Sequence, residues 1–289
     1  MATATIDGLT LAYEVIGEAG RTWTITPGGR FSKDDPGIHE FATALADFGN
    51  RVLIWDRPNC GASDLCFEGD SESAMQADAL AGLLRHLDLG PAIFAGGSGG
   101  ARVSMLAAER HPDLASGLAI WWISGGIYGL ISVGSYYCGA SIAAAWQGGM
   151  PAVAELPDWA PSFAQNSANR DRMLAQDRDT FIATLERWLL AYCPCGDVLV
   201  PGLSESDAQA IGVPTLVFRS GTTDLHHRRE TSERIAAVLP NATLVEPPWG
   251  DSEWNERGAA RTSGAAAGLF VRWHLLAPML NDWAASTLG

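Results

Sequence analysis

The amino-acid sequence predicts an α/β fold, a mostly parallel, doubly wound sheet with an inserted helical segment. Short β-rich runs alternate with helical patterns over residues 1–124, as the crossover connections of a parallel sheet require. The alternation stops there and resumes near residue 211. Hydrophobic residues make up 47% of the 289 residues and charged residues only 18%. Such a chain can bury a large core, so disorder is not expected.

The elements expected in the first part of the chain are short, and each has an apolar face. A hairpin is expected around the turn Asp7-Gly8. After this hairpin, segments with apolar residues at strand spacing alternate with segments that have them at helix spacing. The expected strands cover 3–6, 10–16, 22–26, 52–55 and 118–123, and the expected helices cover 38–48 and 74–87. A further helix is expected near the end of the chain, over 269–283.

The strongest local motif joins an apolar run from Ile93 to a helical pattern through Gly96-Gly97-Ser98-Gly99-Gly100. A strand, a Gly-x-Ser-x-Gly turn and a helix in this order predict a nucleophile elbow. The glycines remove side chains that would collide on so sharp a turn. The start of the helix also offers free N–H groups beside the hydroxyl, where an oxyanion would form. Ser98 is therefore the candidate nucleophile.

This order of motifs resembles the α/β-hydrolase superfamily. Pro27-Gly28-Gly29 looks like the oxyanion loop of that family, and the loop 56–64 looks like its loop after the fourth strand. A strand over 213–218 and the turn that ends at Asp224 look like the segment that carries its catalytic acid.

The resemblance implies a hydrolase core over 1–124 and 211–289 and a helical cap over 125–210. It also implies an oxyanion hole formed by the backbone N–H groups of Gly29 and Gly99. The resemblance gives Asp224 the role of the acid that orients a catalytic base.

The histidine of the family pattern is missing from its usual place. The family expects it just after the last strand, here 242–246, but residues 247–254 contain no histidine. His227 lies three residues after Asp224 and would share its side if a helical turn begins there. We therefore predict a Ser98, His227 and Asp224 triad. The other candidates for the base, which stay open, are His274, Asp251 and Glu253.

Candidate substrate-binding residues lie beside the oxyanion loop, in the cap and after the last strand. Arg30 could hold a substrate carboxylate or a polarised carbonyl. Trp146 belongs to an aromatic-rich cap, and Trp249 follows the last strand. Most of the aromatic residues in the cap are expected to form its own core. A cap of this composition predicts a small substrate with an apolar or aromatic part.

Composition and missing motifs argue against several other partners. A net charge of −14 argues against nucleic-acid binding. The sequence has neither a phosphate-binding glycine loop nor zinc-like ligand spacing, so no cofactor and no metal are expected. The five cysteines, Cys193-x-Cys195 among them, and a start at 1–10 without a signal-peptide pattern favour a cytoplasmic setting.

The uncharged stretch 114–154 is long enough to raise the question of a membrane span. Its many glycines and serines interrupt every run of large apolar residues, so no membrane partner is expected. A homodimer is left open.

Three hypotheses for function remain. The first is a serine hydrolase that cleaves a small carboxylic ester, a lactone or a C–C bonded ketone. The second is a hydrolase-fold enzyme with lyase or carboxylate-based chemistry, and the third is a ligand-binding pseudoenzyme. The complete elbow and Asp224 favour the first, whereas the missing histidine favours the other two.

Overall fold

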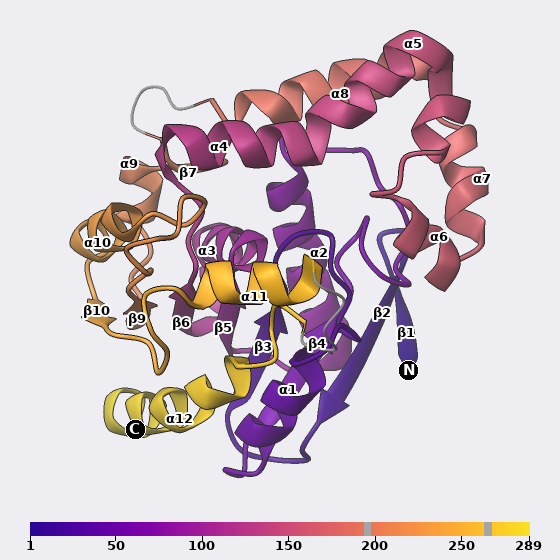
Figure 1. The fold of residues 1–289 in the computed structure, drawn as a ribbon. Coiled ribbons are helices and arrows are strands. Elements are labelled where there is room, and N and C mark those ends of the chain that lie inside the picture. Colours follow the sequence, from indigo (N-terminus) through magenta and orange to yellow (C-terminus); the bar gives the residue numbers. More distant parts are fainter. Residues whose placement is uncertain (194–197, 263–267) are drawn as a thin grey trace.

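A computed structural model of the chain describes residues 1–193, 198–262 and 268–289. Its centre is an eight-stranded sheet in the order β1-β2-β4-β3-β5-β6-β9-β10 (Figure 1). The pairs β1–β2 and β2–β4 are antiparallel, and all the other neighbours are parallel. The strands are β1 (Ala2–Ile6), β2 (Leu9–Ile16), β3 (Thr22–Thr26), β4 (Arg51–Trp55), β5 (Ala92–Gly97), β6 (Ala115–Trp121), β9 (Thr215–Phe218) and β10 (Ala242–Val245). The predicted mostly parallel sheet is confirmed.

Helices cover both faces of this sheet and bury a core on each. Alternate residues of one strand point to opposite faces, so Leu53 joins one apolar cluster while Val52 and Ile54 join the other. The face of Leu53 is covered by α2 (Glu72–Leu87), α3 (Gly99–Arg110) and α10 (Arg229–Val238). The opposite face is covered by α1 (Ile38–Ala46), η3 (Trp273–Leu276) and α12 (Ala277–Thr287). Two further helices are η1 (Pro112–Leu114) and α11 (Glu253–Thr262).

After β6 the chain forms the inserted helical segment that the sequence predicts, and we keep the name cap for it. Its helices are α4 (Gly126–Gly134), the π-helical turn η2 (Ser135–Gly139), α5 (Ala140–Ala154), α6 (Ala160–Gln165), α7 (Ala168–Leu174) and α8 (Arg178–Leu190). The hairpin β7 (Val198–Val200) and β8 (Leu203–Ser204) and the short helix α9 (Glu205–Ala208) follow. Figure 1 shows α4, α5 and α8 lying across one end of the sheet. The cap helices share an apolar cluster of their own, which includes Phe181, Leu185 and Trp188.

One helical stretch among the described residues, Gly126–Ala154, could cross a membrane by length and composition alone. Its mean hydropathy is 1.2, and 33% of its most apolar window is buried. The stretch is not one regular helix, because it contains η2 and a non-helical backbone at Gly149. The expectation that it does not span a membrane stays a prediction.

Most expected elements differ from the structure by one or two residues in their bounds, and two differ by more. The helix expected over 269–283 is replaced by η3 and then α12, which begins at Ala277. Pro278 lies in the first turn of α12, where its missing N–H breaks no helical hydrogen bond. The strand expected over 118–123 is β6, which ends at Trp121 because the positive φ of Trp122 turns the chain out of the sheet.

Candidate active site

Ser98 lies on the turn between β5 and α3 and has the strained backbone of a nucleophile elbow. Its φ is +56° and its ψ is −120°, a region that residues with side chains rarely adopt. The turn also requires glycine beside it, because a β-carbon on Gly100 would lie 1.9 Å from the carbonyl oxygen of Thr26. The local sequence therefore builds the elbow and places the Ser98 hydroxyl at the carboxyl end of β5.

His227 connects Ser98 to Asp224 from the loop that follows β9. Its Nε2 lies 2.9 Å from Ser98 Oγ, and its Nδ1 lies 2.8 Å from Asp224 Oδ2. The side chains of His227 and Asp224 are 1% and 2% exposed, so water hardly competes for these bonds. When Nδ1 carries the proton that is donated to Asp224, Nε2 is free to accept the proton of the Ser98 hydroxyl. The structure thus brings the three predicted residues into one hydrogen-bonded relay.

Aromatic side chains hold the His227 ring in this position. The Trp254 ring meets it edge to face, with 4.4 Å between ring centroids. Trp122 lies nearly parallel to it, with centroids 6.2 Å apart. These contacts restrict the rotation of the imidazole and exclude water from it.

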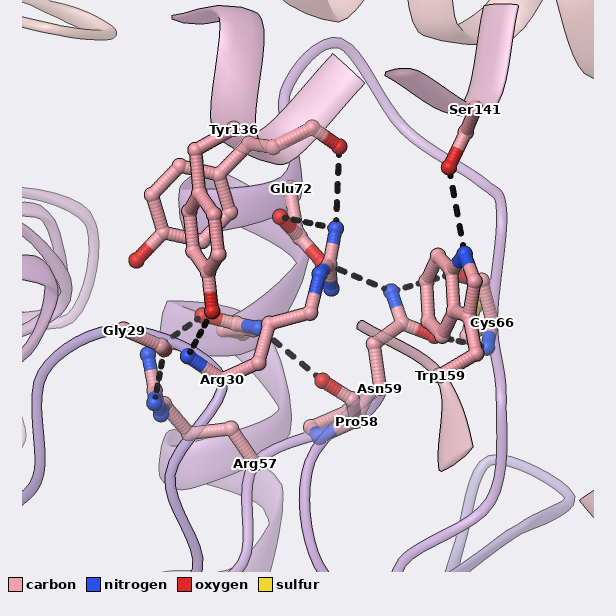
Figure 2. Close-up of polar contacts among 12 residues, drawn as sticks. Gly29, Arg30, Arg57, Pro58, Asn59, Cys66, Glu72, Tyr136, Ser141 and Trp159 are labelled. Atoms are coloured by element: carbon pink, nitrogen blue, oxygen red, sulfur yellow. Dashed lines mark hydrogen bonds and ion pairs between the residues drawn. The ribbon is translucent and has the colours of Figure 1, made fainter. Parts of the chain in front are cut away.

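The N–H groups of Gly29 and Gly99 border one space beside Ser98. A β-carbon on Gly99 would lie 3.4 Å from the Gly29 nitrogen, and one on Gly28 would lie 2.8 Å from Ser98 Cβ. Within the part of the chain that the structure describes, neither N–H has a hydrogen-bond acceptor. Arg57 donates to the carbonyl oxygen of Gly29 (Figure 2) and to that of Gly28, and so fixes the orientation of this loop. This arrangement suits an oxyanion hole.

A cavity of about 790 Å³ opens at Ser98 and His227. This volume lies in the range of small-molecule sites. The cap forms one wall, and the oxyanion loop and α11 contribute to the others. Its apolar and aromatic lining residues among those described are Phe31, Val133, Tyr136, Tyr137, Pro157, Pro161, Trp254, Leu269 and Phe270.

Solved structures with the same architecture span nearly the whole chain. The enol-lactonase from Burkholderia xenovorans LB400 is 21% identical, with a TM-score of 0.57 over 91% of this chain and 97% of its own. A thermophilic esterase from Thermogutta terrifontis is 18% identical, with a TM-score of 0.61 over 100% and 99% of the two chains. An α/β hydrolase fold protein from Chitinophaga pinensis is 16% identical, with a TM-score of 0.62 over 99% and 97%. The chain has the α/β-hydrolase fold.

No protein-family model and no curated protein sequence matches the chain. The solved structures described above confirm the resemblance at the level of the α/β-hydrolase fold. Sequence identities this low show a shared fold, and the reaction must be argued from the residues of the site.

The other candidates for the base do not line the cavity at Ser98, and each has another polar partner. His274 is exposed, and its Nδ1 lies 2.9 Å from the carbonyl oxygen of Val271. Asp251 accepts a hydrogen bond from the Thr222 hydroxyl at 2.9 Å. Glu253 is buried and forms an ion pair with Arg272 at 2.6 Å.

Arg30 was expected to bind a substrate carboxylate or carbonyl, but its guanidinium binds other groups of the protein (Figure 2). Nη1 donates to Glu72 Oε1 at 2.6 Å, and Nη2 donates to the carbonyl oxygen of Tyr137 at 3.0 Å. The Trp159 ring packs against it, with the ring centroid 4.2 Å from Cζ. Burial opposes the charge of Arg30, but the Glu72 carboxylate, together with the neighbouring Cys60 and Tyr136, raises the pKa of Arg30. Arg30 therefore ties the oxyanion loop to α2 and the cap, and it is not a free cation for a substrate carboxylate.

Arg30 borders the cavity, but the two predicted substrate-binding tryptophans lie away from it. Trp146 is 63% exposed on α5, and Trp249 packs on Trp122 with centroids 5.8 Å apart. Neither is among the residues that line the cavity. Trp254, five residues after Trp249, lines the cavity instead. Both tryptophans follow the last strand, which suggests that one of them lies near the site. The sequence does not indicate which of the two rings points into the cavity.

The described residues contain no group of three or more potential metal ligands. Of the Cys193-x-Cys195 pair, Cys195 lies outside the described residues, and Cys193 is a free thiol. The expectation of a site without metal or cofactor stays a prediction.

Proposed function

We propose that the protein is a serine hydrolase that cleaves small carboxylic esters or lactones. The relay from Ser98 through His227 to Asp224, with contacts of 2.9 and 2.8 Å, carries this proposal. A serine hydroxyl becomes a nucleophile at neutral pH only when a positioned base takes its proton. The enol-lactonase and the esterase with the same fold support the reaction class at low identity.

The geometry supports a two-step acyl transfer. Ser98 Oγ attacks the carbonyl carbon while His227 Nε2 takes its proton, and Asp224 stabilises the resulting imidazolium. The N–H groups of Gly29 and Gly99 hydrogen-bond to the oxyanion. His227 then gives its proton to the leaving alkoxide. A water molecule, deprotonated by His227, attacks the acyl-enzyme, and Ser98 regains its proton as the acid departs.

The cavity favours a substrate with an apolar or aromatic part. A volume of about 790 Å³ has room for a small ester or lactone. The rings of Phe31, Tyr136 and Phe270 line it and would contact such a group. The same serine chemistry would cleave a C–C bonded ketone, so ketones belong among the substrates tested.

The relay also weakens the two competing hypotheses. Lyase or carboxylate-based chemistry and a pseudoenzyme role were considered because the sequence has no histidine after the last strand. His227 supplies an imidazole from another loop, so that reason no longer applies.

Labelling with a fluorophosphonate probe tests the proposal. Such probes react with an activated serine, so we expect a covalent adduct on Ser98, located by mass spectrometry. Ser98→Ala and His227→Ala should both abolish labelling. His274→Ala, which removes an exposed histidine that does not contact Ser98, is the control and should label like the wild type. A wild type that neither reacts with the probe nor turns over a panel of esters, lactones and ketones would contradict the proposal.

A further inference from the structure

We infer that the Tyr137 hydroxyl, supplied by the cap, is a third hydrogen-bond donor to the oxyanion, and that the buried guanidinium of Arg102 strengthens this donor. The inference rests on the proposed function and deepens it. It assigns a catalytic role to a cap residue and a supporting role to a residue of α3.

Three donor-bearing residues converge on one point beside the nucleophile. The position that a β-carbon on Gly99 would occupy lies 2.8 Å from the Tyr137 hydroxyl oxygen. The same position lies 3.4 Å from the Gly29 nitrogen and 3.5 Å from Nη2 of Arg102. The Tyr137 hydroxyl, the Gly29 N–H and the Arg102 guanidinium therefore gather beside the backbone of Gly99, the residue that follows Ser98.

Glycine at position 99 is what admits the tyrosine. Any larger residue would place its β-carbon within 2.8 Å of the Tyr137 oxygen, a contact that would force the hydroxyl away. Tyr137 is 4% exposed, and it lines the cavity together with Ser98 and Gly29. Its ring stacks on Tyr192, with centroids 5.8 Å apart and planes 14° from parallel. The hydroxyl is thus held in place before substrate binds, as effective oxyanion stabilisation requires.

Arg102 is a buried cation without a carboxylate partner among the described residues. Its side chain donates to the Ser124 hydroxyl at 3.1 Å and to the Tyr192 hydroxyl at 3.4 Å, and its Nε has no partner there. The guanidinium carbon lies 5.2 Å from the centre of the Tyr137 ring. Burial raises the pKa of Tyr192, so that hydroxyl stays neutral and does not cancel the charge.

Burial opposes the charge of Arg102, but Tyr192, Tyr137 and Glu72 together raise its pKa, so the guanidinium stays charged. The negative charge that develops on the substrate carbonyl oxygen during attack by Ser98 would be attracted to it. In surroundings from which water is excluded, this attraction is stronger than at the protein surface. Arg102 does not line the cavity, so it acts through the Tyr137 hydroxyl and remains a supporting residue. Tyr137 donates a hydrogen bond and keeps its proton.

The structure also couples the position of Tyr137 to the oxyanion loop. Its carbonyl oxygen accepts a hydrogen bond from Arg30, whose guanidinium is paired with Glu72. The backbone N–H of Arg30 in turn donates to the Tyr136 hydroxyl at 3.3 Å. The cap and the oxyanion loop are therefore fastened together next to the donors that they share.

Kinetics of Tyr137→Phe, with Tyr13→Phe of β2 as the matched control, test the inference. Removing one oxyanion donor should lower kcat by about 10²- to 10³-fold with KM within about twofold of the wild type. An arylboronic acid, which forms a reversible tetrahedral adduct with an activated serine, should bind Tyr137→Phe more weakly by a similar factor. Tyr13→Phe should match the wild type in both measurements.

Arg102→Gln and Arg102→Lys separate charge from packing. Loss of the charge in Arg102→Gln should lower kcat and weaken boronate binding, while Arg102→Lys should retain more of both. In the double variant with Tyr137→Phe, the Arg102→Gln effect should be smaller than in the wild-type background, because the two residues act together. Should Arg102→Gln fail to fold, Tyr137→Phe still decides whether the Tyr137 hydroxyl is a donor to the oxyanion, and Arg102→Lys still tests the role of the guanidinium.

Two results would overturn the inference while leaving the proposed function intact. One is wild-type labelling at Ser98 together with unchanged kcat and boronate affinity in Tyr137→Phe. The other is a rise in KM alone, which would make Tyr137 a contact for bound substrate only. A wild type that neither labels nor binds the boronate would instead reject the proposed function, and this inference with it.

Discussion

Both oxygens of the Asp224 carboxylate bind His227. Oδ1 accepts the backbone N–H of His227 at 2.9 Å, and Oδ2 accepts the ring Nδ1 at 2.8 Å. Oδ1 also accepts the backbone N–H of His226, so the acid holds the loop and the imidazole together. A histidine only three residues after this aspartate can therefore point at a serine that lies 129 positions earlier in the chain.

We expect Asp224→Asn to reduce kcat by about 10³- to 10⁴-fold. The asparagine oxygen can still accept the loop N–H groups, but its NH₂ would face Nδ1 and favour the wrong tautomer of His227. Steady-state hydrolysis measures the effect, and circular dichroism checks the fold. Asp251→Asn is the control, because Asp251 bonds Thr222 rather than His227. Equal loss in both variants would contradict the assignment of Asp224.

Gly28→Ala should lower kcat/KM by about 10²-fold, because small misplacements of catalytic groups have effects of this size. The added β-carbon would lie 2.8 Å from Ser98 Cβ and 3.0 Å from the Gly97 carbonyl oxygen, so the oxyanion loop must shift. Gly212→Ala adds the same methyl group where no atom lies within 4 Å, and it should leave the rate unchanged. A Gly28→Ala enzyme with wild-type kinetics would argue against close contact between loop and elbow.

Glu72→Gln should destabilise the protein by about 3 kcal/mol, since it leaves a buried guanidinium without its anion. Both side chains of the Arg30–Glu72 pair are 4% exposed, and Asn59 also donates to Glu72 (Figure 2). Chemical denaturation measures the change. Asp113→Asn removes the carboxylate of an exposed pair with Arg85 and should leave stability unchanged within error. Similar small effects in both variants would contradict the structural role of Arg30.

His226 predicts a pH dependence of stability. Burial, followed by the neighbouring His227, lowers the pKa of His226 from its ordinary value of 6.5. Between that lowered pKa and 6.5 the unfolded chain binds more protons than the folded protein, so the free energy of unfolding decreases as the pH falls through this window. His226→Gln lacks this titration but keeps the backbone N–H that binds Asp224.

Melting temperatures of the wild type and His226→Gln between pH 8 and pH 5 measure this effect. The wild type should lose stability relative to the variant as the pH falls. A difference between the two that stays constant with pH would show that His226 titrates alike in the folded and unfolded states.

Local patterns in the sequence predict much of the fold and the relay. The alternation of short apolar runs and helical faces indicates the parallel sheet, and the glycines around Ser98 indicate the elbow, because backbone sterics act over a few residues. The spacing of Asp224 and His227 likewise suggests a pair, since residues three apart on a turn share one side. The family pattern alone pointed to the loop after β10, which carries no histidine.

Contacts between distant segments decide the rest of the site. The sequence suggests that Arg30 is free to bind a substrate, yet its positive charge is paired with the carboxylate of Glu72, 42 residues later. Trp146 and Trp249 turn away from the cavity, while Tyr137 and Trp254 line it. The sequence alone thus determined the sheet, the turn at Ser98 and the pairing of Asp224 with His227, because backbone rules over neighbouring residues control them. Only the tertiary structure decided which charges are compensated and which rings face Ser98, because burial and pairing depend on segments that meet only when the chain folds.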